Sequence, residues 1–155
     1  MAITMDQGGF VAGYAGECYI TIGTRRYNFM QATKVSAKVT KNKEKKAVLG
    51  KSGKINKTTG WEGSGSMTFQ FNTSVFAKMI EDFKNTGKDA YFEMQITNKD
   101  DGSDVGAQTI ILKNCNADSV DLAMLDVGST ALESSTDFTF DDFEVIESFT
   151  DLAGM

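Results

Sequence analysis

Period-two alternation of apolar and polar residues runs through most of the chain and constrains its fold more than any other feature. The stretch "KVSAKVTK" sets Val35, Ala37 and Val39 against lysine, serine and threonine, and "GSMTFQF" and "YFEMQITN" alternate in the same way. The stretches "CYITI" and "RRYNFM" flank Gly23-Thr24, a glycine-first pair that suits a tight type II′ hairpin. Alternation puts one strand face on a core and the other in water, so these segments predict a mostly antiparallel sheet.

One segment breaks the alternation and predicts a helix. The stretch "NTSVFAKMIEDFKNTG" has apolar residues at helical spacing, with Asn72 or Thr73 able to cap its start and Gly87 its end. We expect this helix near residues 74–86. The fold class that follows is mainly β, an antiparallel β-sandwich or split barrel with one α-helix, in a single domain spanning residues 1–155.

Further strands are expected in the second half of the chain, from "AQTIILKN", "SVDLAML" and "STDFTFDDFEVIESF". In the last of these the apolar positions move from even numbers to odd numbers. A β-bulge near Asp141-Asp142 would absorb that shift within one strand. The glycine-rich residues 1–16 and the C-terminal residues 148–155 are expected to be flexible.

Charge is distributed unevenly along the chain. Residues 1–60 carry eleven Lys or Arg and three Asp or Glu, a net charge of +8, whereas residues 61–155 carry five and eighteen, a net charge of −13. The most basic run is residues 41–60, "KNKEKKAVLGKSGKINKTTG". Because both signs lie on one chain, the complementary partner of the basic run could be another copy.

Sites for catalysis, cofactors and metals are not indicated. The chain has no histidine, and Cys18 and Cys115 lie in apolar strand patterns typical of small buried hydrophobic residues. Gly50-Lys51-Ser52 resembles a phosphate loop, but Lys45 stands where that loop needs its first glycine. We therefore expect no enzyme and no cofactor. The absence of a long apolar run or a signal peptide favours a cytoplasmic protein without a membrane span.

The basic run admits two interpretations. Folded back as two stretches of about nine residues, it would reach roughly 30 Å, beyond a domain whose radius of gyration is ~15 Å. It could then contact another subunit, and contacts between unlike surfaces build rings or filaments. The alternative is a small nucleic-acid-binding module, although no aromatic residues are interleaved for base stacking. The lysines that would make either contact are Lys43, Lys45, Lys46, Lys51, Lys54 and Lys57.

The stretches "VTKNKEKKAVLGK", "GWEGSGSMTF", "LKNC" and "DFTFDDFEV" carry a resemblance to a known family. The chain resembles the tail tube proteins of contractile-tailed bacteriophages, in the family of the tube protein of the defective Bacillus prophage PBSX, with which R-type bacteriocin tube proteins belong. The resemblance covers nearly the whole chain.

The resemblance implies a structural subunit with the same β fold. Such subunits form hexameric rings that stack into a hollow tube inside a contractile sheath, and residues 41–60 match the loop that reaches a neighbouring ring. The implied partners are the chain itself, the tail sheath protein, baseplate or initiator proteins and tail terminator proteins. The implied location is the virion tail or a tail-like particle, assembled in the host cytoplasm.

In a phage the implied tube passes DNA through its lumen without specific binding, and in a bacteriocin it punctures an envelope. Close phosphate contacts would stall a sliding duplex, so a weakly repulsive lining is expected. The candidate lumen-facing acids are Asp118, Asp121, Asp137 and Asp141.

Overall fold

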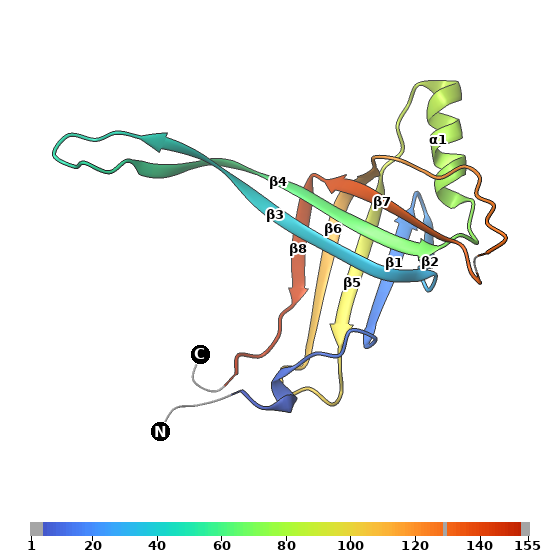
Figure 1. Ribbon diagram of the computed structural model, residues 1–155, viewed down its shortest axis with the longest axis horizontal. Coiled ribbons are helices and arrows are strands. Elements are labelled where there is room, and N and C mark those ends of the chain that lie inside the picture. The colour runs from blue at the N-terminus through green and yellow to red at the C-terminus, as the bar shows by residue number, and fades with distance from the viewer. Residues whose placement is uncertain (1–4, 129, 153–155) are drawn as a thin grey trace.

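Eight antiparallel strands form one sheet that folds over onto itself, with a helix at one end (Figure 1). This computed structural model describes residues 5–128 and 130–152. The strand order is β2-β1-β5-β6-β7-β4-β3, and β8 also pairs with β6. Within the described residues this confirms a mainly β fold with one α-helix. The elements are β1 (Gly16–Ile22), β2 (Arg25–Asn28), β3 (Ala32–Lys46), β4 (Ile55–Gln70), α1 (Val75–Thr86), β5 (Phe92–Lys99), β6 (Ala107–Ala117), β7 (Glu133–Phe140) and β8 (Asp142–Glu147), with a 3-10 helix η1 at Gln7–Gly9.

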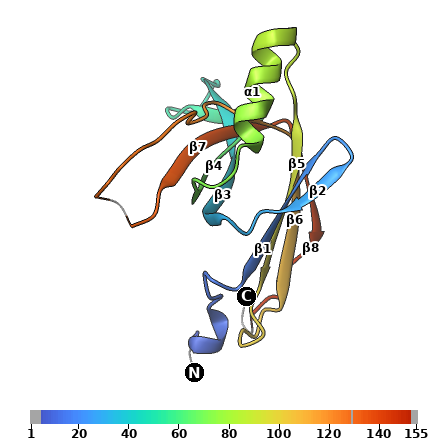
Figure 2. The ribbon, with the colours of Figure 1, turned by 90° about the vertical axis from the view of Figure 1, so that its right-hand side faces the viewer.

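Strand β6 forms the corner at which the sheet folds over (Figure 2). Most of β6 pairs with β5 on one side and β8 on the other, whereas its last residues, Asn116 and Ala117, pair with β7. The two halves of the sheet, β2-β1-β5-β6-β8 and β7-β4-β3, bury their facing side chains against each other. The most deeply buried of these come from both halves: Met67, Met94, Cys115 and Phe138.

Helix α1 closes one end of the core through an aromatic cluster. Phe76 is buried, and its ring centroid lies 5.9 Å from Phe29, 5.4 Å from Phe69 and 5.8 Å from Phe92. The helix begins after Ser74, and Gly87 ends it in the left-handed conformation at φ 72°. Both the helix and its glycine cap are confirmed. The N-cap residue differs from the prediction: it is Ser74, not Asn72 or Thr73. The Thr73 hydroxyl nevertheless accepts a hydrogen bond from the Val75 amide at 3.4 Å.

The alternation predicted for the first strands is confirmed on the core side. Met67 and Phe69 of β4 point into the core. In the turn between β1 and β2, Gly23 has a positive φ of 61°. Strand β3 differs, because only Val35 of its apolar face packs on the core while Ala37 and Val39 are exposed. The reason is that β3 and β4 continue past the end of the body.

The prediction of a strand at "SVDLAML" is wrong. The residues have no strand conformation, and they connect β6 to β7 across the fold. Instead of backbone pairing with a neighbouring strand, they accept hydrogen bonds from β7 side chains. The Thr136 hydroxyl donates to the Ser119 carbonyl at 2.6 Å, and the Ser134 hydroxyl donates to the Asp121 carboxylate at 2.6 Å. The apolar residues alternate here without a neighbouring strand to pair with.

The single bulged strand predicted for the last segment is also wrong. The segment forms two strands, with β7 pairing with β4 and β8 pairing with β6, and Asp141 lies between them. The shift from even to odd apolar positions therefore marks a change from one half of the sheet to the other. After the corner, Phe143 and Val145 lie opposite Leu112 and Ile110 of β6.

Both described ends of the chain lie at the connection between β5 and β6. The Asp104 amide donates to the Gly8 carbonyl at 2.7 Å, the Ala12 amide donates to Asp100 at 3.0 Å, and the Thr150 amide donates to the Val105 carbonyl at 2.7 Å. Of the segments predicted to be flexible, residues 1–4 and 153–155 lie outside the described residues. The described residues of these two segments are attached to the connection between β5 and β6 by these hydrogen bonds.

Candidate functional site: a projecting basic arm

The basic run, residues 41–60, forms the outer part of a long two-stranded ribbon that projects from the body (Figure 1). We call residues 41–60 the arm. Pairing between β3 and β4 continues out to Lys46 and Ile55, so only residues 47–54 form a connection without strand structure. The segment expected to be an extended loop is thus mostly paired strand. Every residue from Ser36 to Thr59 is exposed in the single chain.

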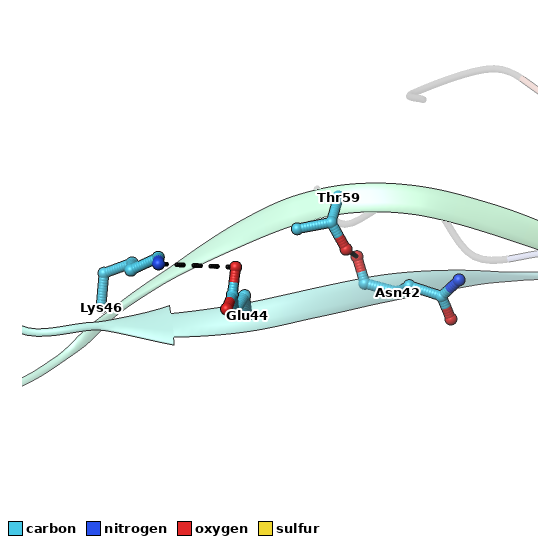
Figure 3. Close-up of polar contacts among 4 residues, drawn as sticks. All are labelled: Asn42, Glu44, Lys46 and Thr59. Atoms are coloured by element: carbon cyan, nitrogen blue, oxygen red, sulfur yellow. Dashed lines mark hydrogen bonds and ion pairs between the residues drawn. The ribbon is translucent and has the colours of Figure 1, made fainter.

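A β-bulge lies near the base of the arm (Figure 3). Asn42 pairs with Gly60 and Lys43 pairs with Thr58, which leaves Thr59 as the extra residue on β4. The Thr59 hydroxyl donates to the Asn42 carbonyl at 3.2 Å and fixes this irregularity. A bulge bends a strand and increases its twist, so it sets the direction in which the outer ribbon points.

Trp61 anchors the base of the arm on the body. It pairs with Lys41 across the ribbon, and its indole packs edge-to-face on Phe143 of β8 with ring centroids 5.6 Å apart. Phe143 in turn packs on Phe140 of β7 at 6.5 Å. Beyond Trp61 the arm has only its own two strands for support.

Positive charge on the arm is almost unopposed within the chain. The arm contains seven lysines and one glutamate, Glu44, giving it a net charge of +6. Among the described residues, the one ion pair on the arm joins Lys46 to Glu44 at 3.5 Å, and both side chains are more than half exposed (Figure 3). An exposed pair of this kind contributes little to stability. The six predicted contact lysines all lie on the arm, four on its paired strands and two in the connection at its tip: Lys43, Lys45, Lys46 and Lys57, and Lys51 and Lys54.

The four candidate acids do not form one cluster. Asp118 and Asp137 come together, because the Asp118 amide donates to the Asp137 carbonyl at 2.8 Å and both residues line one hollow with Lys38. Asp121 lies with Ser134, and Asp141 lies at the corner between β7 and β8. All four residues are exposed.

A polar face on the half-sheet β7-β4-β3 was not identified from the sequence. Ser36 and Ser66 hydroxyls lie 3.2 Å apart, and those of Thr68 and Ser135 lie 3.0 Å apart. These residues alternate with the buried ones along the same strands. The signal was present in "GSGSMTFQF", whose polar positions are small hydroxyl residues on one face.

The cysteines belong to the core. Burial raises the pKa of Cys115 to about 12, although a hydrogen bond with the Met94 backbone opposes the rise. Burial also raises the pKa of Cys18 to about 12. Both therefore remain neutral thiols at physiological pH. No group of three or more potential ligands that could hold a metal occurs among the described residues, and no helix there is long and apolar enough to cross a membrane.

Comparison with known proteins identifies the family. Residues 3–147 match the family described as phage tail tube protein. The chain belongs to this family. A relative, the phage-like element PBSX protein XkdM of Bacillus subtilis (strain 168), is 40% identical over 115 residues, which are 74% of this chain and 78% of the relative. The resemblance to the PBSX tube protein family is therefore confirmed, and the protein is a structural component of a phage tail or tail-like particle, not an enzyme.

Solved structures share the fold. A chain in the anti-feeding prophage cap, described as a tube-terminating cap, has a TM-score of 0.66 at 10% identity, covering 96% of this chain and 95% of its own. A chain in the sheath–tube complex of an extracellular contractile injection system, PVC, in its extended state has a TM-score of 0.65 at 10% identity, covering 89% and 91%. These likenesses support the tail-tube fold.

Proposed function

We propose that this tail tube protein builds the inner tube of a contractile tail or tail-like particle by forming hexameric rings that stack. The single observation that carries the proposal is the arm, a basic ribbon that leaves the body and is exposed along its whole length. The tube would serve as a conduit for DNA or as a puncturing device.

The arm is built in a way that calls for an external partner. A lone two-stranded hairpin is only marginally stable in water, and beyond Trp61 the arm buries no side chain on its own body. Its lysines keep an exposed ribbon soluble until it meets an acidic surface. From Lys41 to the tip the arm reaches roughly 30 Å, enough to contact another ring.

Ring closure is supported by free strand edges. Within the part of the chain that the structure describes, β2, β3 and β8 each pair with one neighbour only. Such edges present unpaired backbone N–H and C=O groups to a neighbouring copy. Pairing between unlike edges of successive copies is a heterologous contact, which closes a ring when the rotation fits.

The lumen lining is proposed to be the polar face of β7-β4-β3. Small hydroxyl groups predominate on this face, and Asp118 and Asp137 oppose the charge of Lys38, which lines the same hollow. The face therefore offers a duplex little net attraction to its phosphates. Asp121 and Asp141 remain candidates for the same lining. A tube whose mapped lumen residues are mainly lysine or arginine would contradict this assignment.

The proposed partners are other tail components. The solved structures that share the fold come from a sheath–tube complex, a baseplate and a tube-terminating cap. We propose that this chain likewise meets a sheath protein outside the tube and a baseplate or initiator and a terminator at its ends. DNA would pass without specific binding.

Charge reversal on the arm tests the proposal. We expect a variant with Lys43, Lys45 and Lys57 changed to Glu to stay folded and monomeric under conditions in which the wild type forms tubes. The matched control changes the exposed lysines Lys78, Lys84 and Lys99 to Glu. Both variants have a net charge of −5 − 6 = −11, so only the position of the charge differs.

Electron microscopy and sedimentation at high protein concentration and low salt measure the outcome. Tubes from the control but not from the arm variant support assembly through the arm. Tubes from both variants at the wild-type concentration would contradict it. A gel shift with duplex DNA, lost in the arm variant but kept in the control, would favour the nucleic-acid alternative.

A further inference from the structure

We propose that the apolar tip of the arm inserts into the apolar hollow beside helix α1 of another copy. The inference rests on the proposed function and adds to it the receptor for the arm. It names which residues dock and on which surface of the neighbouring molecule they dock.

The tip of the arm carries aliphatic side chains in the midst of lysines. Leu49 has a relative exposure of 104%, and Val48 beside it is also exposed. Gly50 follows with a positive φ of 80°, so the turn holds Leu49 at the far end of the ribbon. Val48 and Leu49 thus form an adjacent exposed apolar pair that another copy could bury.

The hollow beside α1 has the complementary chemistry. It opens to solvent, has a volume of about 230 Å³, and lies between the helix, the start of β5 and the end of β6. Ile80 and Phe83 on its rim are exposed by 37% and 45%. Its lining is mostly apolar: Phe76, Met79, Ile80, Phe83, Phe92 and Val120.

Acidic groups stand at the edge of this hollow. Asp89 and Asp118 line it, whereas Lys78 and Lys84 of the helix and Lys88 after it do not. Asp89 accepts hydrogen bonds from the Asn116 amide group and from the Ala90 backbone amide, which orient its carboxylate. An apolar floor with an acidic rim matches an apolar tip surrounded by lysines, so both hydrophobic and charge complementarity favour this pairing.

The arrangement of the chain makes the contact intermolecular. The arm projects from one end of the molecule, and α1 lies toward the opposite end (Figure 1). A paired ribbon anchored at Trp61 cannot turn back across the body to reach its own helix. A contact between opposite ends of successive copies is heterologous and propagates, as stacking of rings requires.

Leu49 provides a clean test because it is fully exposed in the isolated chain. We expect Leu49→Asp to leave the melting temperature unchanged and to raise the protein concentration needed for tube formation at least tenfold. Leu49→Met, which keeps an apolar tip, is the control and should assemble near the wild-type concentration. Normal assembly of Leu49→Asp would overturn the inference.

Cross-linking locates the receptor. Leu49→Cys and Phe83→Cys are prepared as separate variants and mixed, so that only a contact between copies can join them. Under air oxidation we expect a disulfide-linked dimer that appears as tubes form and whose yield falls in high salt. Wild-type protein, whose two thiols lie in the core, supplies the background.

A second mixture pairs Leu49→Cys with Leu125→Cys on the exposed connection between β6 and β7. Tubes that form without a 49–83 bond, or with a 49–125 bond in its place, overturn the inference and leave the proposed function standing. A chain that stays monomeric at every concentration and gives neither bond overturns both.

Discussion

A single methyl group at Gly65 should destabilise the whole body of the protein. A Cβ atom built there would lie 2.4 Å from the Ser36 carbonyl oxygen and 2.5 Å from the Phe138 ring. Neither neighbour can move easily, because one is backbone of the adjacent strand and the other is a ring with 0% exposure. Overpacking of this kind costs about 1–3 kcal/mol, and two such contacts place Gly65→Ala near the upper value.

The expected change in melting temperature follows from the size of the chain. For a domain of 150–250 residues, 1 kcal/mol corresponds to about 2–4 °C, so Gly65→Ala should lower the melting temperature by about 6–12 °C. Circular dichroism melting of the monomer in salt high enough to prevent assembly measures this. The m-value in urea should stay unchanged if the folded state is otherwise intact.

Gly60→Ala is the matched control on the same strand. A Cβ at Gly60 would meet nothing within 4 Å, and its φ is not in the left-handed region. Alanine there should leave stability unchanged or raise it by up to about 1 kcal/mol, because it restricts the unfolded chain. If Gly65→Ala melts within about 2 °C of Gly60→Ala, the close packing of β4 against Phe138 is wrong.

Three further predictions concern the core. Phe92→Ala should destabilise the body by about 3–5 kcal/mol, measured by urea unfolding, because Phe92 is buried against Phe76; a loss under 1 kcal/mol would contradict that packing. The thiols of Cys18 and Cys115 should resist maleimide at pH 8 until the protein is unfolded. Since their folded pKa of about 12 exceeds the unfolded value near 9, stability should fall as pH rises from about 9 toward 12, and the fall should shrink in Cys115→Ala.

The sequence was most informative where a strand has one face on the core. In β7 the apolar and buried Phe138 and Phe140 alternate with exposed residues, so periodicity predicts a strand there, although it did not show where the strand ends. The burial of the polar Ser134 and Thr136 follows only from the fold. The same periodicity misleads at residues 119–125, because alternation says nothing about whether a neighbouring strand has a free edge. There the hydrogen bonds go to β7 side chains, which no local pattern indicates.

The arm shows the opposite limit. Its departure from the body could be predicted from charge and length, but its pairing as a ribbon could not. Both faces of a ribbon in water are polar, so no alternation of hydrophobicity marks its strands. The hollow beside α1 was equally hidden, since Phe83, Phe92 and Val120 come from three separate segments that only the fold brings together.

Strands β3 and β4 divide their length between two tasks, and this division separates folding from assembly. Their inner halves bury Val35, Met67 and Phe69 against the core, and Gly63 and Gly65 lie directly against Phe140 and Phe138 where the ribbon leaves the body. Beyond that point no arm side chain is buried, so changes of charge or shape there have little folded-state packing to disturb. Loss of tubes with an unchanged melting temperature is therefore diagnostic of a lost contact between copies. The same loss after a change at Gly65, together with a lower melting temperature, would instead report a disturbed body.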